Sequence, residues 1–140
     1  MNADKLKYQN EIQQIIGASF EVLNSLGHGF FEKVYERALI REFAVRSIPY
    51  KSQACFKIIY KEELVGEYIP DIVAYDRIII ELKTIERITD HERGQALNYL
   101  KVTGKEAGLI LNFKRSKLEW EKLVLTNSQN IRVNPCPSVV

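Results

Sequence analysis

The chain of 140 residues lacks the sequence features that mark several large classes of protein. No apolar run is long enough to cross a membrane, and the first residues are too polar for a secretory signal, so we expect no membrane partner. The chain also lacks the Gly-x4-Gly-Lys-Ser/Thr loop, the Gly-x-Gly-x-x-Gly turn and the Gly-x-Ser-x-Gly elbow. Nucleoside triphosphate, dinucleotide and serine-hydrolase chemistry are therefore disfavoured.

Cysteine and histidine are scarce, with two residues of each. Cys55 and Cys136 do not have metal-ligand spacing, and there is no cluster of cysteine and histidine that would hold zinc. We interpret both cysteines as reduced thiols, which are typical of a cytoplasmic protein, and a disulfide is the alternative.

The composition, with 46% hydrophobic and 27% charged residues, is that of an ordinary globular domain. The formal net charge is only +2, but residues 1–82 carry a net charge of −2 and residues 83–140 a net charge of +4. This asymmetry is compatible with a polyanion-binding surface in the second half and does not require one.

Apolar residues recur at helical spacing in three segments, at about 4–27, 31–46 and 90–103. In the second segment Val34 and Tyr35 are expected to point inward. The third segment is expected to have Thr89 or Asp90 as its N-cap and to end at Gly104.

Five segments have the pattern of strands, at about 54–60, 64–75, 77–83, 107–113 and 119–125. The resulting order, α-α-β-β-β-α-β-β, predicts an α/β domain with a mixed β-sheet flanked by helices. We expect a single domain over residues 1–125 and a polar C-terminal tail over residues 126–140.

Charged residues stand at the end of a strand that is otherwise apolar. Glu81 and Lys83 are two residues apart, so their side chains share a face, and Asp71 follows Pro70 in the preceding segment. A carboxylate in an apolar setting is costly unless it is paired or binds a metal. A Glu81–Lys83 contact where the strand reaches water, and a turn at Asp71, are the simpler interpretations of each motif alone.

Two of the expected helices add polar residues on inward arcs. Glu32 falls within the apolar arc of its helix, and an interaction with the helix dipole is the competing explanation. Gln95 and Tyr99 are neighbours at i and i+4 on the third helix. For Tyr99, the competing explanation is a buried tyrosine whose hydroxyl needs a partner.

Four motifs follow one another along the chain: GFFEKVY (29–35), PD (70–71), ELK (81–83) and QALNY (95–99). Together they resemble the GxxExxY family of the PD-(D/E)XK nuclease superfamily, over about residues 10 to 125. The resemblance implies a PD-(D/E)XK nuclease-like fold and a metal-dependent nuclease.

The resemblance also implies the metal ligands. Asp71 and Glu81 would hold a divalent ion, with the backbone carbonyl of Leu82 as a further ligand. Glu32 would lie in the outer shell or help to bind a second ion. Oxygen ligands of this kind suit Mg²⁺, with Mn²⁺ as an alternative, and such an ion supplies a nucleophilic hydroxide and charge relief on a phosphate.

The remaining roles concern the water and the substrate. By resemblance, Lys83 would orient or deprotonate the attacking water, while Gln95 and Tyr99 would fix Lys83 and the scissile phosphate. The segment FKRSK (113–117) adds three basic residues after a strand, Lys114, Arg115 and Lys117, and Lys105 is expected nearby. These side chains suit phosphate contacts with nucleic acid, for which we expect DNA, and a solubilising turn explains them equally well.

Two other functions fit the same residues. One is a non-catalytic nucleic-acid-binding or regulatory module on the same fold, and the other is an ionic network that serves stability alone. The sequence is compatible with a homo-oligomer in each case.

The hairpin between Asp71 and Glu81 provides a geometric test. A two-residue turn at Asp76–Arg77 would place the two acids on opposite faces of the sheet, where they could not share an ion. We therefore predict an irregular hairpin, with either a three-residue turn at 75–77 or a β-bulge that re-aims Asp71. We also predict that Glu32 converges on the same site.

Overall fold

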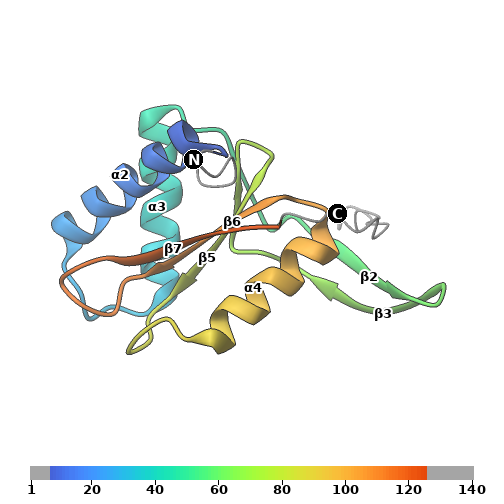
Figure 1. Ribbon diagram of the computed structural model, residues 1–140. Coiled ribbons are helices and arrows are strands. Elements are labelled where there is room, and N and C mark those ends of the chain that lie inside the picture. The colour runs from blue at the N-terminus through green and yellow to red at the C-terminus, as the bar shows by residue number, and fades with distance from the viewer. Residues whose placement is uncertain (1–6, 126–140) are drawn as a thin grey trace.

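The computed structural model describes residues 7–125, and a five-stranded mixed sheet with the order β1-β4-β5-β6-β7 lies at its centre (Figure 1). The strands are β1 (Tyr50–Ser52), β4 (Ile72–Ala74), β5 (Ile78–Lys83), β6 (Ala107–Asn112) and β7 (Glu119–Val124). β5 and β6 are parallel, and the other neighbouring strands are antiparallel. The strand that carries Glu81 and Lys83 is therefore the middle strand of the sheet.

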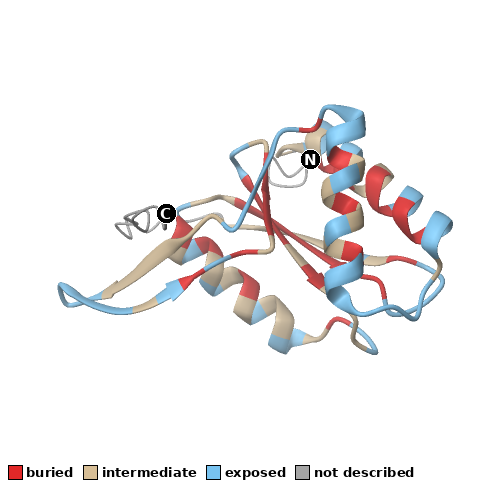
Figure 2. Cartoon of the chain, turned by 180° about the vertical axis from the view of Figure 1, so that it is seen from behind, coloured by how far each residue is buried: buried red, intermediate tan, exposed pale blue. Residues whose placement is uncertain are grey.

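Helices cover both faces of this sheet. α2 (Gln9–Leu26) and α3 (Glu32–Arg46) pack on one face, and α4 (Asp90–Thr103) packs on the other. The helices bury one side each and expose the other, as expected for a layered α/β domain (Figure 2).

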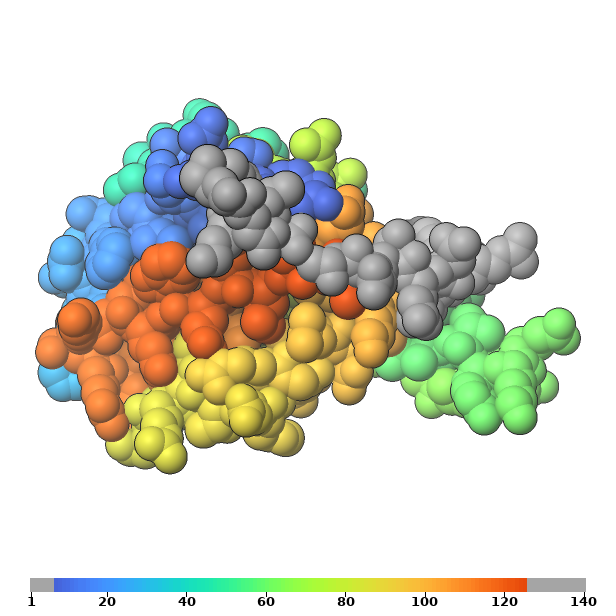
Figure 3. Space-filling view, viewed as in Figure 1, coloured from blue at the N-terminus to red at the C-terminus, as the bar shows by residue number. Residues whose placement is uncertain are grey.

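A separate two-stranded hairpin, β2 (Phe56–Tyr60) and β3 (Glu63–Tyr68), projects from the body of the protein (Figure 3). Its base packs against α4 through Phe56, Ile58 and Tyr68, whereas Tyr60 near its tip is 62% exposed. The base of the hairpin thus belongs to the α4 side of the sheet.

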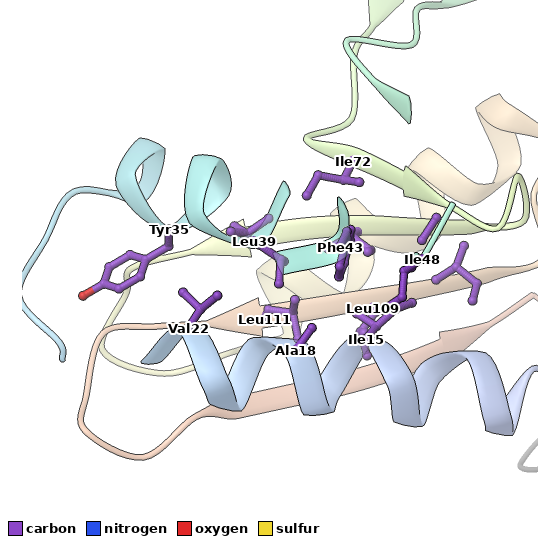
Figure 4. Packing of buried hydrophobic residues seen from close by; sticks show 14 of the residues in the cluster. Ile15, Ala18, Val22, Tyr35, Leu39, Phe43, Ile48, Ile72, Leu109 and Leu111 are labelled. Carbon is purple, nitrogen blue, oxygen red and sulfur yellow. The ribbon is translucent and has the colours of Figure 1, made fainter. Parts of the chain in front are cut away.

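The side chains of β5 alternate between the two faces. Ile80 and Leu82 belong to the large core shared with α2 and α3, and Ile79 belongs to the core under α4. Figure 4 shows other members of the large core, such as Ile15, Leu39 and Leu109. By the same alternation, Glu81 and Lys83 point toward the α4 side.

The fold class and the order of elements expected from the sequence are confirmed. α3 and α4 match their expected bounds within one residue. Thr89 is the N-cap of α4, in a capping box with Glu92, and the helix ends at Gly104, whose φ of 71° is left-handed.

Some details differ from the expectations. The single strand expected over 64–75 is divided into β3 and β4, which belong to different sheets, because Pro70 has no N–H for a ladder. The short strand β1 was not expected. Val34 is 37% exposed rather than inward, because the buried stripe of α3 is narrower than the helical wheel indicates.

Cys55 is disulfide-bonded, so the expectation of a reduced thiol is wrong at this position. Local spacing carries no signal for such a bond, because it depends on which segments fold together. Cys136 and the expected tail over 126–140 lie outside the described residues. Within residues 7–125, no helix is long and apolar enough to span a membrane.

Candidate active site

The hairpin between β4 and β5 has a three-residue turn over 75–77. Ile72 pairs with Ile80, and one further step along the two strands places Asp71 opposite Glu81. Opposed residues share a sheet face, so both acids lie on the α4 side. The predicted irregular hairpin is confirmed, in the form with the longer turn.

Asp71 and Glu81 lie close enough for each carboxyl group to affect the pKa of the other. Burial, followed by the negative charge of Asp71, raises the pKa of Glu81 to about 8. Burial also raises the pKa of Asp71, although its Oδ2 accepts a hydrogen bond from the backbone N–H of Leu82 at 2.8 Å. The closeness of the two carboxyl groups thus favours the protonated form of Glu81.

Tyr68 completes this arrangement from the base of the hairpin. Its hydroxyl donates a hydrogen bond to Oε1 of Glu81, and its ring stacks on Tyr99 of α4, with ring centroids 3.8 Å apart and an interplanar angle of 13°. Burial, and then the nearby Glu81, raise the pKa of Tyr68, so the hydroxyl remains a donor. Sequence reasoning missed Tyr68, because an aromatic residue in a strand usually indicates core packing.

Two acids near the start of α3, Glu32 and Glu36, lie near Asp71. The negative charge of Glu36 contributes to the raised pKa of Asp71. Loss of hydration, followed by the charge of Asp71, raises the pKa of Glu32, and the charge of Lys83 opposes this shift. Glu32 thus lies within electrostatic reach of Asp71 and Lys83, and its role in the site stays a prediction.

Two details of the start of α3 differ from the expectations. Glu32 is exposed and is not part of an apolar arc, because it is the first residue of the helix. Glu36 was missed, although its position four residues after Glu32 places both on one side of the helix.

Lys83 and the two polar residues of α4 lie on the same side of the sheet. Nζ of Lys83 donates to Oε1 of Gln95 at 3.5 Å, which is a long contact. Tyr99 stacks on the ring of Tyr68, so its link to Glu81 runs through Tyr68.

The basic segment 113–117 follows β6, at the end of the sheet where β5 also ends. Lys114, Arg115 and Lys117 are all exposed, and Arg115 forms an ion pair with Glu86 at 3.1 Å. The expectation that Lys105 lies near this segment is wrong. It precedes β6, and its Nζ donates to the backbone carbonyl of Asp76 at 2.8 Å, at the opposite end of the strand.

The donor set fits a hard divalent ion. Asp71, directly before β4, and Glu81, on β5, offer carboxylate oxygens close to each other, and Mg²⁺ binds with one or two carboxylates while it keeps several waters. In residues 7–125, no group of three or more His, Cys, Asp or Glu side chains has the geometry to hold a metal. These residues therefore suit an ion that the protein holds through two acids, and they do not suit zinc.

Comparison with known proteins agrees with this geometry. Residues 9–123 match the family model described as the PD-(D/E)XK nuclease superfamily, a span that contains every residue of the site. The comparisons with curated proteins and with solved structures yielded no match. The matched span covers most of the chain, and the chain belongs to the PD-(D/E)XK nuclease superfamily.

Proposed function

We propose that the protein is a metal-dependent nuclease of the GxxExxY type, which hydrolyses phosphodiester bonds in DNA. The observation that carries this proposal is the position of Asp71 opposite Glu81, with Lys83 on the same face of the sheet. In a member of a nuclease superfamily, this is the arrangement that phosphodiester hydrolysis requires.

Three groups would hold the ion: the carboxylates of Asp71 and Glu81, and the backbone carbonyl of Leu82. Mg²⁺ is the expected ion, with Mn²⁺ as an alternative; when bound, it supplies a nucleophilic hydroxide and relieves charge on the phosphate oxygens. The N–H of Leu82 and the hydroxyl of Tyr68 hold the two carboxylates in place.

The basic and polar side chains of the site would act on the water and the phosphate. Lys83 orients the attacking water and neutralises charge on the phosphate, and Gln95 restrains its ammonium group. Tyr99 fixes the site from α4 through Tyr68. Glu32, at the rim, belongs to the outer shell of the ion or helps to bind a second ion.

The segment 113–117 would contact the DNA backbone. Lys114, Arg115 and Lys117 are exposed at the end of β6, and the register of β5 and β6 places that end beside Lys83. Phosphate contacts of this kind position a strand without reading its sequence.

A second candidate function is non-catalytic binding of nucleic acid on the same fold. The absence of a third acid in metal-ligating geometry in residues 7–125 favours it. An ionic network that serves stability alone predicts neither binding nor cleavage.

A cleavage assay separates these candidates. Labelled single-stranded, duplex and branched DNA, with RNA beside them, should be cut in Mg²⁺ or Mn²⁺ and remain intact in EDTA. Asp71→Asn should abolish cleavage, whereas Asp76→Asn, a matched change in an exposed turn, should not. Binding of DNA without cleavage in either metal would overturn the nuclease proposal in favour of the binding module.

A further inference from the structure

Three loops meet at the end of the sheet where β5 and β6 finish, over residues 27–31, 84–89 and 113–118 (Figure 1). Tyr35 joins the first loop to the third. Its hydroxyl donates to the carbonyl of Gly27 at 2.7 Å and accepts from the N–H of Phe30 at 3.2 Å. Its ring stacks on Phe113, with centroids 4.8 Å apart.

Asn112 joins the second loop to the third. Its Oδ1 accepts from the N–H groups of Ile85 (3.1 Å) and Lys114 (3.3 Å), and its Nδ2 donates to the carbonyl of Ile85 at 2.8 Å. Asn112 is only 3% exposed and pairs in register with Lys83. The three loops are therefore held in a fixed arrangement next to the candidate active site.

Phe31 is the most exposed large hydrophobic residue of this arrangement, at 87%. It is the N-cap of α3 and immediately precedes Glu32, but its side chain makes no capping hydrogen bond. The neighbouring Phe30 packs edge-on against Tyr35, at 6.2 Å between centroids. Phe31 thus adds little to the core, and an exposed aromatic side chain next to an active site suits a ligand.

The second and third loops together carry more basic than acidic residues. A pocket of about 270 Å³ between the second and third loops is lined by Arg87, Arg115 and Lys117, among other residues. Of its two acids, Glu86 is paired with Arg115, and Glu119 accepts hydrogen bonds from Ile88 and Asn112. With three basic and two acidic side chains, the lining has a net charge of +1, which is complementary to a phosphate backbone.

We propose that these loops bind an unpaired segment of nucleic acid, with one base stacked on Phe31 and the backbone phosphates on Lys114, Lys117 and Arg87. A base inside a duplex is covered by its neighbours on both faces, so only an unpaired base offers a face to an exposed ring. The inference rests on the proposed function, because the strand would run past Lys83. It names the preferred substrate as single-stranded nucleic acid or a duplex with an unpaired end.

The full-length chain provides a direct probe of stacking. Trp120 is the single tryptophan, so Trp120→Phe combined with Phe31→Trp leaves one indole at the proposed site. In EDTA, where no metal-dependent cleavage occurs, a DNA oligonucleotide should quench this fluorescence as a single strand, and not as a blunt duplex. In the protein that keeps Trp120, Phe31→Ala should weaken binding of the single strand about 5- to 150-fold.

Matched variants control for general effects. Tyr60→Ala removes another exposed aromatic side chain, at the hairpin tip, and should leave binding unchanged. Lys114→Gln and Lys117→Gln should each reduce the slope of log K against log salt by about 0.7, whereas Lys51→Gln, at the other end of the sheet, should not.

Equal binding by the Phe31→Ala and Tyr60→Ala variants would overturn the inference, as would equal quenching by strand and blunt duplex. Loss of self-association in Phe31→Ala, with strand binding intact, would show that Phe31 contacts a second copy of the chain instead. Quenching by the strand without cleavage would refute the proposed nuclease and support the inference. Cleavage that is unaffected by Phe31→Ala, with no quenching, would support the proposed nuclease and refute the inference.

Discussion

Asp71 and Glu81 lie opposite each other across the β4–β5 hairpin, on the face of the sheet that α4 covers. They share this face because the turn between them has three residues. The charge of Asp71 contributes to the raised pKa of Glu81, and Tyr68 donates a hydrogen bond to Glu81.

Lys83→Ala should abolish cleavage and leave metal binding intact, because the ammonium group contacts water and phosphate rather than the ion. We expect the single-turnover rate to fall at least about 100-fold, with metal affinity by calorimetry unchanged. Lys101→Ala, an exposed change on α4, is the control and should behave as the wild type. Loss of metal affinity in the Lys83 variant would show that its assigned role is wrong.

Tyr68→Phe should weaken metal binding about 10-fold, because it removes the hydrogen bond that orients Glu81 and keeps the stacked ring. Calorimetric titration with Mn²⁺ would measure the change. Tyr99→Phe removes the other hydroxyl of the stacked pair and should have a smaller effect. Equal affinity in the wild type and the Tyr68 variant would exclude a positioning role for this hydroxyl.

The metal-free protein should lose stability as the pH rises from about 5 to 8. The pKa of Glu81 is raised from 4.5 to about 8 on folding, so the native state binds more protons than the unfolded state in this window. The free energy of unfolding then falls with pH, by at most about 1.4 kcal/mol per unit for one proton. Urea denaturation in EDTA would measure this slope.

Glu81→Gln is the matched variant for the pH series, because it keeps the shape of the side chain and cannot titrate. The free energy of unfolding of this variant should change less steeply with pH than that of the wild type. Identical slopes in the two proteins would mean that Glu81 is ionised throughout the window.

Tyr35→Phe should lower the free energy of unfolding by about 1–3 kcal/mol, because the carbonyl of Gly27 and the N–H of Phe30 lose their partner. The stacked contact with Phe113 remains in this variant. Tyr60→Phe, at the exposed hairpin tip, should change stability by less than about 0.5 kcal/mol. Equal stability of the two variants would show that the hydroxyl of Tyr35 does not tie the loop to α3.

Local patterns were sufficient to predict the elements that present the site. The apolar run of β5 and the cap and stop residues of α4 depend on neighbours in the sequence, and both elements were placed correctly. An irregular hairpin was also predicted. Strand alternation lets Asp71 and Glu81 share a face only if the hairpin has a three-residue turn or a bulge instead of a two-residue turn.

The parts that could not be predicted depend on contacts between distant segments. Tyr68 reaches Glu81 only because the projecting hairpin folds back onto α4, and nothing around Tyr68 in the sequence indicates this. Glu36 lies near Asp71 although the two residues are 35 positions apart in the sequence, and only the packing of α3 on the sheet brings them together. Pro70 was the local signal that the segment 64–75 would divide.

Direct titration of a divalent ion tests most directly whether Asp71 and Glu81 together hold one metal. Calorimetry with Mn²⁺ at pH 8 should show one ion bound by the wild-type protein, with release of protons because the pair must ionise. Asp71→Asn and Glu81→Gln should each abolish this binding, and Asp76→Asn should retain it. Binding that survives in both the Asp71 and the Glu81 variants, or no binding by the wild type, would contradict the shared metal site.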